Sequence, residues 1–159
     1  MGIIVQKFGG TSVADPQKIH NVAKAVIREK ENGNDVVVVV SAMGHTTDHL
    51  IKLAKEVTNT PDSREMDMLL STGEQVSIAL LAMAIQSQGY KAVSMNGQQV
   101  GIVTECIHTK ARIVDIKTEK LQKKLSEGNI IVVAGFQGVT PDGEITTLGR
   151  GGSDTSAVA

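Results

Sequence analysis

The chain has 159 residues, enough for one domain with a substantial core, and its 16 basic and 17 acidic residues nearly balance. Only 2% of the residues are aromatic, so the composition offers neither the charge nor the stacking surface that nucleic acids require. With one cysteine, no signal peptide and apolar stretches too short or too interrupted for a bilayer, the sequence predicts a soluble, cytoplasmic protein without disulfide, metal site or membrane span.

The first half of the chain alternates strand and helix patterns. Residues 3–8 predict a short strand, and the apolar spacing of residues 16–31 predicts a helix that Asp15 caps and Pro16 begins. Five consecutive valines at 36–40 predict a strand buried on both faces, as in a parallel sheet covered by helices. Helices are expected at 48–57 and 65–88, and the second is apolar nearly all round, so we place it in the core or under a second subunit.

The second half continues this alternation. It predicts strands at 90–95 and 130–134, a helix at 116–126 and the turn of a hairpin at 140–144. The order of elements implies an α/β protein, a three-layer α/β/α sandwich with a mostly parallel sheet. The last residues resemble a glycine-rich cap and the first turn of a helix, so we expect the fold to be incomplete at its C-terminus.

Polar or glycine-rich clusters follow the predicted strands, which is where α/β sheets bind ligands. In the first cluster Lys7 supplies positive charge, Gly9 and Gly10 allow close approach to phosphate oxygens, and the helix that starts at Pro16 presents unpaired N–H groups. This loop predicts a polyphosphate site. It has neither the Walker A spacing nor the dinucleotide-binding spacing, and a purely structural turn is the alternative.

The other polar residues each have two interpretations. The hydroxyls of Ser41 and Thr47 either bind phosphate or a polar substrate, or cap helices. Glu74 interrupts a very apolar helix, and its carboxylate requires either a ligand cation or a structural salt bridge. Arg150 either binds a carboxylate or phosphate with its two-pronged guanidinium or is a solvated loop residue. Asp154 either caps the last helix or holds a lysine or a metal near a transferred phosphate.

Four segments together resemble one known family. They are Lys7-Phe8-Gly9-Gly10-Thr11-Ser12-Val13, Ser41-Ala42-Met43-Gly44, Ser71-Thr72-Gly73-Glu74 and Gly149-Arg150-Gly151-Gly152-Ser153-Asp154. Over essentially its whole length the chain resembles the aspartokinases of the amino acid kinase family. The resemblance implies transfer of the γ-phosphoryl group of ATP, with Mg²⁺, to the β-carboxylate of L-aspartate. This reaction is the first step towards lysine, threonine and methionine, and towards diaminopimelate in bacteria.

The resemblance also implies roles for the matching residues. Lys7 and Asp154 would be catalytic, because Lys7 neutralises charge on the transferred phosphate and Asp154 orients Lys7. The nucleotide phosphates would be bound by Lys7, Phe8, Gly9, Gly10, Ser12 and Ser41. Aspartate would be bound by Thr47, Glu74, Arg150, Gly151, Gly152 and Ser153. Within this set, Glu74 would face the ammonium group and Arg150 a carboxylate.

On this resemblance, residues 1–159 are the N-terminal, substrate-binding portion of the catalytic domain, without the nucleotide-binding half or the regulatory domains. We therefore expect little turnover from this chain alone, and a homo-oligomer or association with the rest of the kinase. Two alternatives remain: a non-catalytic interaction subunit derived from the kinase half, and a kinase for another amino acid such as acetylglutamate.

Overall fold

A parallel sheet lies at the centre of the fold, in a computed structural model that describes residues 2–149 and 151–159. Its strands, in spatial order, are β1 (Ile3–Phe8), β2 (Asp35–Val40), β6 (Ile130–Ala134) and β3 (Ala92–Met95). Along β2, Val36, Val38 and Val40 pack into one core, and Val37 and Val39 pack into another. A strand that faces two cores must be apolar at every position, which explains the run of valines.

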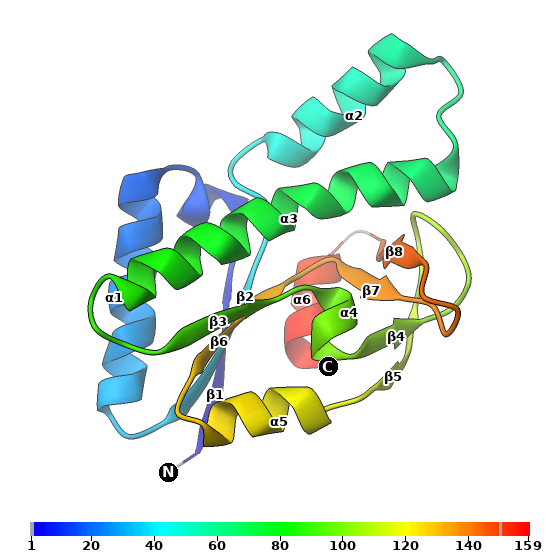
Figure 1. Cartoon of the computed structure of the whole chain (residues 1–159). Coiled ribbons are helices and arrows are strands. Elements are labelled where there is room, and N and C mark those ends of the chain that lie inside the picture. Colours follow the sequence, from blue (N-terminus) through cyan, green and yellow to red (C-terminus); the bar gives the residue numbers. More distant parts are fainter. Residues whose placement is uncertain (1, 150) are drawn as a thin grey trace.

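Helices cover both faces of this sheet (Figure 1). On one face lie α1 (Pro16–Glu31) and α3 (Ser63–Gln86); on the other lie α4 (Gly97–Val100), α5 (Glu119–Ser126) and α6 (Gly152–Val158). The predicted three-layer α/β/α sandwich with a parallel sheet is therefore confirmed. Helix α1 begins and ends at the predicted residues, with the Asp15 carboxylate accepting the Lys18 N–H at 2.8 Å.

A second, smaller sheet carries the remaining strands. In spatial order these are β5 (Ile113–Ile116), β4 (Ile102–Thr104), β7 (Gln137–Val139) and β8 (Ile145–Thr147). Strands β7 and β8 form the predicted hairpin. The helix expected from residue 116 is wrong at its start, because Ile116 pairs with Ile102 in the sheet and α5 begins only at Glu119. The pairing of Ile116 depends on a strand elsewhere in the sequence, so the residues around Ile116 alone do not predict it.

Helix α3 is the longest element, and α2 (Thr46–Val57) packs on the side of α3 that faces away from the parallel sheet (Figure 1). By length and composition α3 could cross a bilayer, so the expectation that every apolar stretch is too short or too interrupted was wrong. Its inner face nevertheless buries Asp67, Ser71 and Glu74 within the fold, and its outer face exposes apolar side chains. Helix α3 therefore packs in the core of the fold, as expected, but it is not apolar all round, because its buried face also carries polar side chains.

Asp67 joins three distant segments through a fully buried carboxylate. It accepts hydrogen bonds from the Thr147 hydroxyl of β8 at 2.6 Å and from the Thr109 N–H at 3.1 Å, and its Oδ2 lies 2.7 Å from His108 Nδ1. A buried carboxylate is stable only with such partners. Asp67 therefore ties α3 to β8 and to the loop between β4 and β5.

We expect Asp67→Ala to destabilise the chain by about 3–5 kcal/mol, because three polar groups lose a buried acceptor. Urea unfolding measures the change. The control is Asp142→Ala, at an exposed turn position, which should change the free energy of unfolding by no more than about 0.5 kcal/mol. Equal stability of the two variants would contradict the structural role of Asp67.

Candidate functional site

A polar crevice of about 330 Å³ opens beyond the carboxyl ends of β1, β2 and β6. Its lining residues come from segments far apart in the sequence: Lys7, Gly10, Ser41, Ala42, Gly44, Thr47, Glu74, Phe136, Gly149, Gly151, Gly152, Ser153 and Asp154. The parallel strands bring their loops to one edge of the sheet, as the general rule for α/β folds requires. Residues from all four segments that the sequence analysis singles out, 7–13, 41–44, 71–74 and 149–154, therefore line one crevice.

An ion pair spans the first and last of these segments. The Lys7 ammonium, at the end of β1, lies 2.9 Å from the Asp154 carboxylate in the first turn of α6. The Asp154 side chain is 70% exposed, so the pair contributes little to stability and leaves the carboxylate accessible from the crevice. The ion pair with Asp154 holds the Lys7 ammonium at the crevice, where an anionic ligand could reach it.

A hydroxyl pair lies in the same crevice. Ser41, which follows β2, donates a hydrogen bond to Ser153 in α6 at 2.9 Å. The backbone of Gly135, after β6, passes so close to Ser153 that a Cβ at Gly135 would lie 2.9 Å from the Ser153 hydroxyl oxygen. Glycine is required there for α6 to approach the strand ends.

Two other glycines bring the opening loop and α3 against the loop that follows β2. A Cβ at Gly10 would lie 2.8 Å from the carbonyl oxygen of Ala42, and a Cβ at Gly73 would lie 2.9 Å from the Ala42 methyl group. The Gly44 N–H donates to the Gly10 carbonyl at 2.9 Å. These close approaches bring the backbone at Gly10 and the α3 face that carries Glu74 to the walls of one crevice.

Glu74 is 2% exposed, and desolvation raises the pKa of its carboxyl from the ordinary 4.5 to about 7. The backbone N–H groups of Glu74 and Ala42 and the Gln137 side chain lower this pKa without offsetting the burial. The Oε2 atom has no hydrogen-bond partner among the described residues, and no ion pair found among them includes Glu74. The described residues therefore provide no salt bridge for Glu74, and a carboxylate in such a crevice wall is suited to a cationic ligand group.

Most of the predicted site residues that the structure describes line the crevice. They are Lys7, Gly10, Ser41, Thr47, Glu74, Gly151, Gly152, Ser153 and Asp154. Gly9 lies beside the Lys7 ammonium, since a Cβ there would be 3.7 Å from Lys7 Nζ. Arg150 lies outside the described residues.

Phe8 and Ser12 lie elsewhere. Both line a separate pocket between the opening loop and α1, because the side chain after Lys7 points to the opposite face of the strand and Phe8 packs against the core there. No residue from Asp15 to Lys18, at the N-terminus of α1, lines the crevice, and Asp15 caps that helix. The helix whose first turn lines the crevice is α6 instead.

Phe136 and Gln137 follow β6 in the glycine-rich cluster Gly135-Phe136-Gln137-Gly138. The sequence predicts this cluster at the binding crevice because it follows a buried strand, but it assigns neither residue a role. Phe136 lines the crevice with a φ of 71°, a conformation uncommon outside glycine, and Gln137 donates from its side-chain nitrogen to the Ser71 carbonyl at 3.1 Å. Among residues 2–149 and 151–159, no cluster of three His, Cys, Asp or Glu side chains gathers to hold a metal.

Comparisons with known proteins agree on one family. The amino acid kinase family model matches residues 2–159. The aspartokinase of Bacillus sp. strain MGA3 is 66% identical over all of this chain, which spans 39% of that protein. Aspartate kinase from Synechocystis superposes with a TM-score of 0.83 at 56% identity, over 99% of this chain and 26% of that one.

A more distant structure, E. coli aspartokinase III in complex with aspartate and ADP, also has a TM-score of 0.83, at 25% identity over 96% of this chain and 44% of that one. This chain thus spans less than half the length of each of these relatives. A family match that extends from residue 2 to residue 159 shows that the chain belongs to the amino acid kinase family.

Proposed function

We propose that this chain forms the acceptor-substrate side of an aspartate kinase site. The enzyme would transfer the γ-phosphoryl group of ATP to the β-carboxylate of L-aspartate and produce 4-phospho-L-aspartate. The observation that carries the proposal is the crevice itself, which combines the Lys7–Asp154 ion pair with a buried carboxylate, in a chain 66% identical to an aspartokinase. Since that relative is longer, we assign adenine and ribose binding and any regulatory domain to parts beyond the matched 39%.

Charge neutralisation is the task of Lys7 in this proposal. A carboxylate that attacks a polyphosphate brings two anions together, so the reaction needs a cation that is already in position. Asp154 holds the Lys7 ammonium at 2.9 Å, and Gly10 lets the phosphate chain approach the backbone closely. These groups orient and stabilise charge without forming a covalent intermediate.

Aspartate recognition rests on Glu74 in this proposal. The Glu74 carboxylate faces the substrate ammonium, while Thr47, Ser153 and the backbone at Gly151 and Gly152 contact its polar groups. Arg150 pairs with a carboxylate of the substrate, a role that rests on its residue type and the family resemblance. Acetylglutamate would be rejected because its acylated nitrogen has no positive charge to pair with Glu74.

A magnesium ion would arrive with the nucleotide. Mg²⁺ in kinases is held by one or two carboxylates together with substrate phosphates, so a dedicated cluster of ligands is not required. The exposed Asp154 carboxylate at the crevice fits this donor set. When bound, the ion would neutralise phosphate charge beside Lys7.

The test compares this chain alone with a chimera in which it replaces the 159 matched residues of the Bacillus aspartokinase. We expect ADP release from magnesium-ATP by the chimera with L-aspartate and not with acetylglutamate, and little release by the chain alone. Release with acetylglutamate would assign another amino acid substrate. A folded chimera that releases no ADP with either substrate would favour the non-catalytic interaction subunit.

In the chimera, Lys7→Ala should lower turnover by a factor on the order of 10³ with little loss of stability, because the lost charge acts on the transferred phosphate. The control is Lys24→Ala, an exposed lysine of α1. Turnover numbers from coupled ADP assays, with thermal unfolding of both variants, measure the effect. Near-normal turnover of Lys7→Ala would remove Lys7 from the mechanism.

Glu74→Gln should stabilise the chain at alkaline pH. The pKa of the Glu74 carboxyl is about 7 in the folded chain and ordinarily 4.5. Between pH 4.5 and pH 7 the folded state therefore keeps a proton on Glu74 that the unfolded state has lost. The free energy of unfolding thus falls as the pH rises through this range. At about 1.4 kcal/mol per pKa unit, the loss of free energy of unfolding approaches about 3 kcal/mol. Glu74→Gln avoids this loss because glutamine carries no charge. Urea unfolding near pH 5 and pH 8, with the exposed Glu119→Gln as control, tests this expectation.

The same substitution should weaken aspartate binding in the chimera. The KM for aspartate should rise as pH falls below about 7, because protonated Glu74 no longer attracts the substrate ammonium. In Glu74→Gln the KM should be at least about tenfold higher at pH 8 and should lose this pH dependence. A parental pH profile that persists in the variant would show that another group is responsible.

A further inference from the structure

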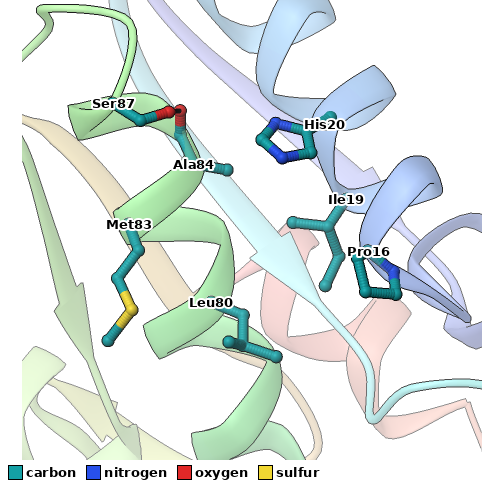
Figure 2. Close-up of a pocket in the computed structure, with 7 residues that line it drawn as sticks. All are labelled: Pro16, Ile19, His20, Leu80, Met83, Ala84 and Ser87. Carbon is teal, nitrogen blue, oxygen red and sulfur yellow. Dashed lines mark hydrogen bonds between the residues drawn. The ribbon is translucent and has the colours of Figure 1, made fainter.

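The groove between α1 and α3 offers little chemistry for a polar ligand (Figure 2). Its lining residues are Pro16, Ile19, His20, Leu80, Met83, Ala84 and Ser87. His20 is exposed, and the Ser87 hydroxyl donates to the Ala84 carbonyl of its own helix at 2.7 Å. A buried polar group to which the proposed function gives no role lies instead in β7: the side-chain amide of Gln137.

The Gln137 amide is held in one orientation. Gln137 is 3% exposed and is not among the residues that line the crevice. Its side-chain nitrogen donates to the Ser71 carbonyl of α3 at 3.1 Å, and its side-chain oxygen accepts the Gly97 N–H of α4 at 3.4 Å. Since the nitrogen meets an acceptor and the oxygen meets a donor, exchanging the two atoms would break both contacts. The nitrogen carries two N–H groups, so a second one remains for another acceptor.

Close backbone contacts fix the position from which the Gln137 side chain extends. A Cβ at Gly97 would lie 2.6 Å from the Gln137 carbonyl oxygen, and a Cβ at Gly138 would lie 2.6 Å from Cγ2 of Thr104. Gln137 also pairs with Thr147 in the β7–β8 hairpin. Strand β7 is therefore confined between α4, β4 and β8, which leaves its backbone little freedom to move.

Glu74 lies one turn beyond Ser71 on α3, so the two residues share a helix face. The amide that binds the Ser71 carbonyl is thereby brought beside the Glu74 carboxyl. Burial is the main cause of the raised pKa of Glu74, and the Gln137 side chain is among the groups that oppose it. An amide lowers the pKa of a carboxyl by donating an N–H to its charged form.

We propose that Gln137 is a positioning residue for Glu74, a role that rests on the proposed function because Gln137 acts only through that carboxylate. Its second N–H donates to one carboxylate oxygen and fixes the rotation of the carboxylate. The other oxygen, Oε2, has no hydrogen-bond partner among the described residues and is left for the substrate ammonium. The contacts with Ser71 and Gly97 keep the amide itself in place.

Other titratable side chains belong to the elements packed around Glu74. They are Lys7 of β1, Asp48 and His49 of α2, Asp67 of α3 and Asp154 of α6. Lys7 and Asp154 line the crevice and pair with each other, Asp67 accepts the Thr147 hydroxyl, and the two α2 residues are exposed. None of these contacts includes the Gln137 side chain. A change in the titration of Glu74 on replacing Gln137 therefore reports the loss of the amide.

Carboxyl ¹³C NMR of the isolated chain follows Glu74 directly and needs no substrate. The Glu74 signal, identified by its loss in Glu74→Gln, should titrate near pH 7. In Gln137→Met, which removes the donor and changes the side-chain volume little, the midpoint should rise by about half a pH unit or more. The matched control is Gln98→Met, at an exposed position of α4, which should leave the midpoint unchanged. A folded Gln137→Met with the parental midpoint would overturn the proposal.

A second measurement covers the case in which Gln137→Met fails to fold. In the ¹⁵N-labelled parental chain, the side-chain NH₂ signals of Gln137 should shift with the same midpoint as the Glu74 carboxyl. In Glu74→Gln they should no longer shift over this pH range. Side-chain signals of Gln137 that do not respond to the titration of Glu74 would contradict the contact and with it the proposal.

In the chimera with the Bacillus aspartokinase, Gln137→Met should raise the KM for aspartate at pH 8 by at least about threefold and change kcat by less than about twofold. The rise of KM with falling pH should also begin at a higher pH than in the parental chimera, because Glu74 then takes up its proton at a higher pH. In a Glu74→Gln background, Gln137→Met should have no further effect on KM.

Each result of the chimera experiment has a distinct meaning. An equal effect of Gln137→Met on KM with and without Glu74 would show that Gln137 acts by another route, which would overturn the proposal. A chimera that releases no ADP would instead overturn the proposed function. The NMR titrations use no substrate, so they decide the contact between Gln137 and Glu74 independently of that outcome.

Discussion

The packing of α3 against the parallel sheet is the contact on which the rest of the structure depends. This helix touches strands of both sheets as well as α1 and α2, and its inner face carries Asp67 and Glu74 in an otherwise apolar interior. Each carboxylate has a different environment. Asp67 accepts several hydrogen bonds and holds β8 in place, whereas Glu74 lines the crevice and has one oxygen without a hydrogen-bond partner among the described residues.

The position of β8 matters for the crevice because Thr147, at its end, is followed at once by the loop that lines the site. The Thr147 hydroxyl binds Asp67, and Gly149 already belongs to the crevice wall. The loop then enters α6, where Asp154 meets Lys7 from the first strand. The buried Asp67 network thus stabilises β8, and β8 leads into the loop and the helix α6 that carry one side of the exposed ion pair.

The buried Glu74 carboxylate has no ion-pair partner among the described residues, and it costs stability at neutral and alkaline pH because desolvation disfavours its charged form. A cationic substrate group would supply the missing partner, so binding would relieve a cost that folding has imposed. In the proposed function Glu74 thus differs from Asp67, whose hydrogen-bond partners all belong to the described chain. Stability and recognition oppose each other at this one position.

The sequence by itself determined the elements whose patterns are local. The bounds of α1 follow from the Asp15 cap and from apolar spacing, and the five valines imply a strand between two cores. Lys7, Glu74 and the glycine clusters could be selected as site residues because strand ends collect ligands and because a carboxylate in an apolar helix needs a partner.

Only the tertiary structure decided which of these residues meet. It places Phe8 and Ser12 outside the crevice, and it brings the first turn of α6, rather than that of α1, to the crevice wall. It also brings Asp67 into contact with His108 and Thr147. It also turns Ile116 into a strand residue. The physical reason is the same in each case: helix periodicity and capping act between neighbours in the sequence, whereas strand pairing, buried hydrogen bonds and close glycine contacts act between segments that only folding brings together.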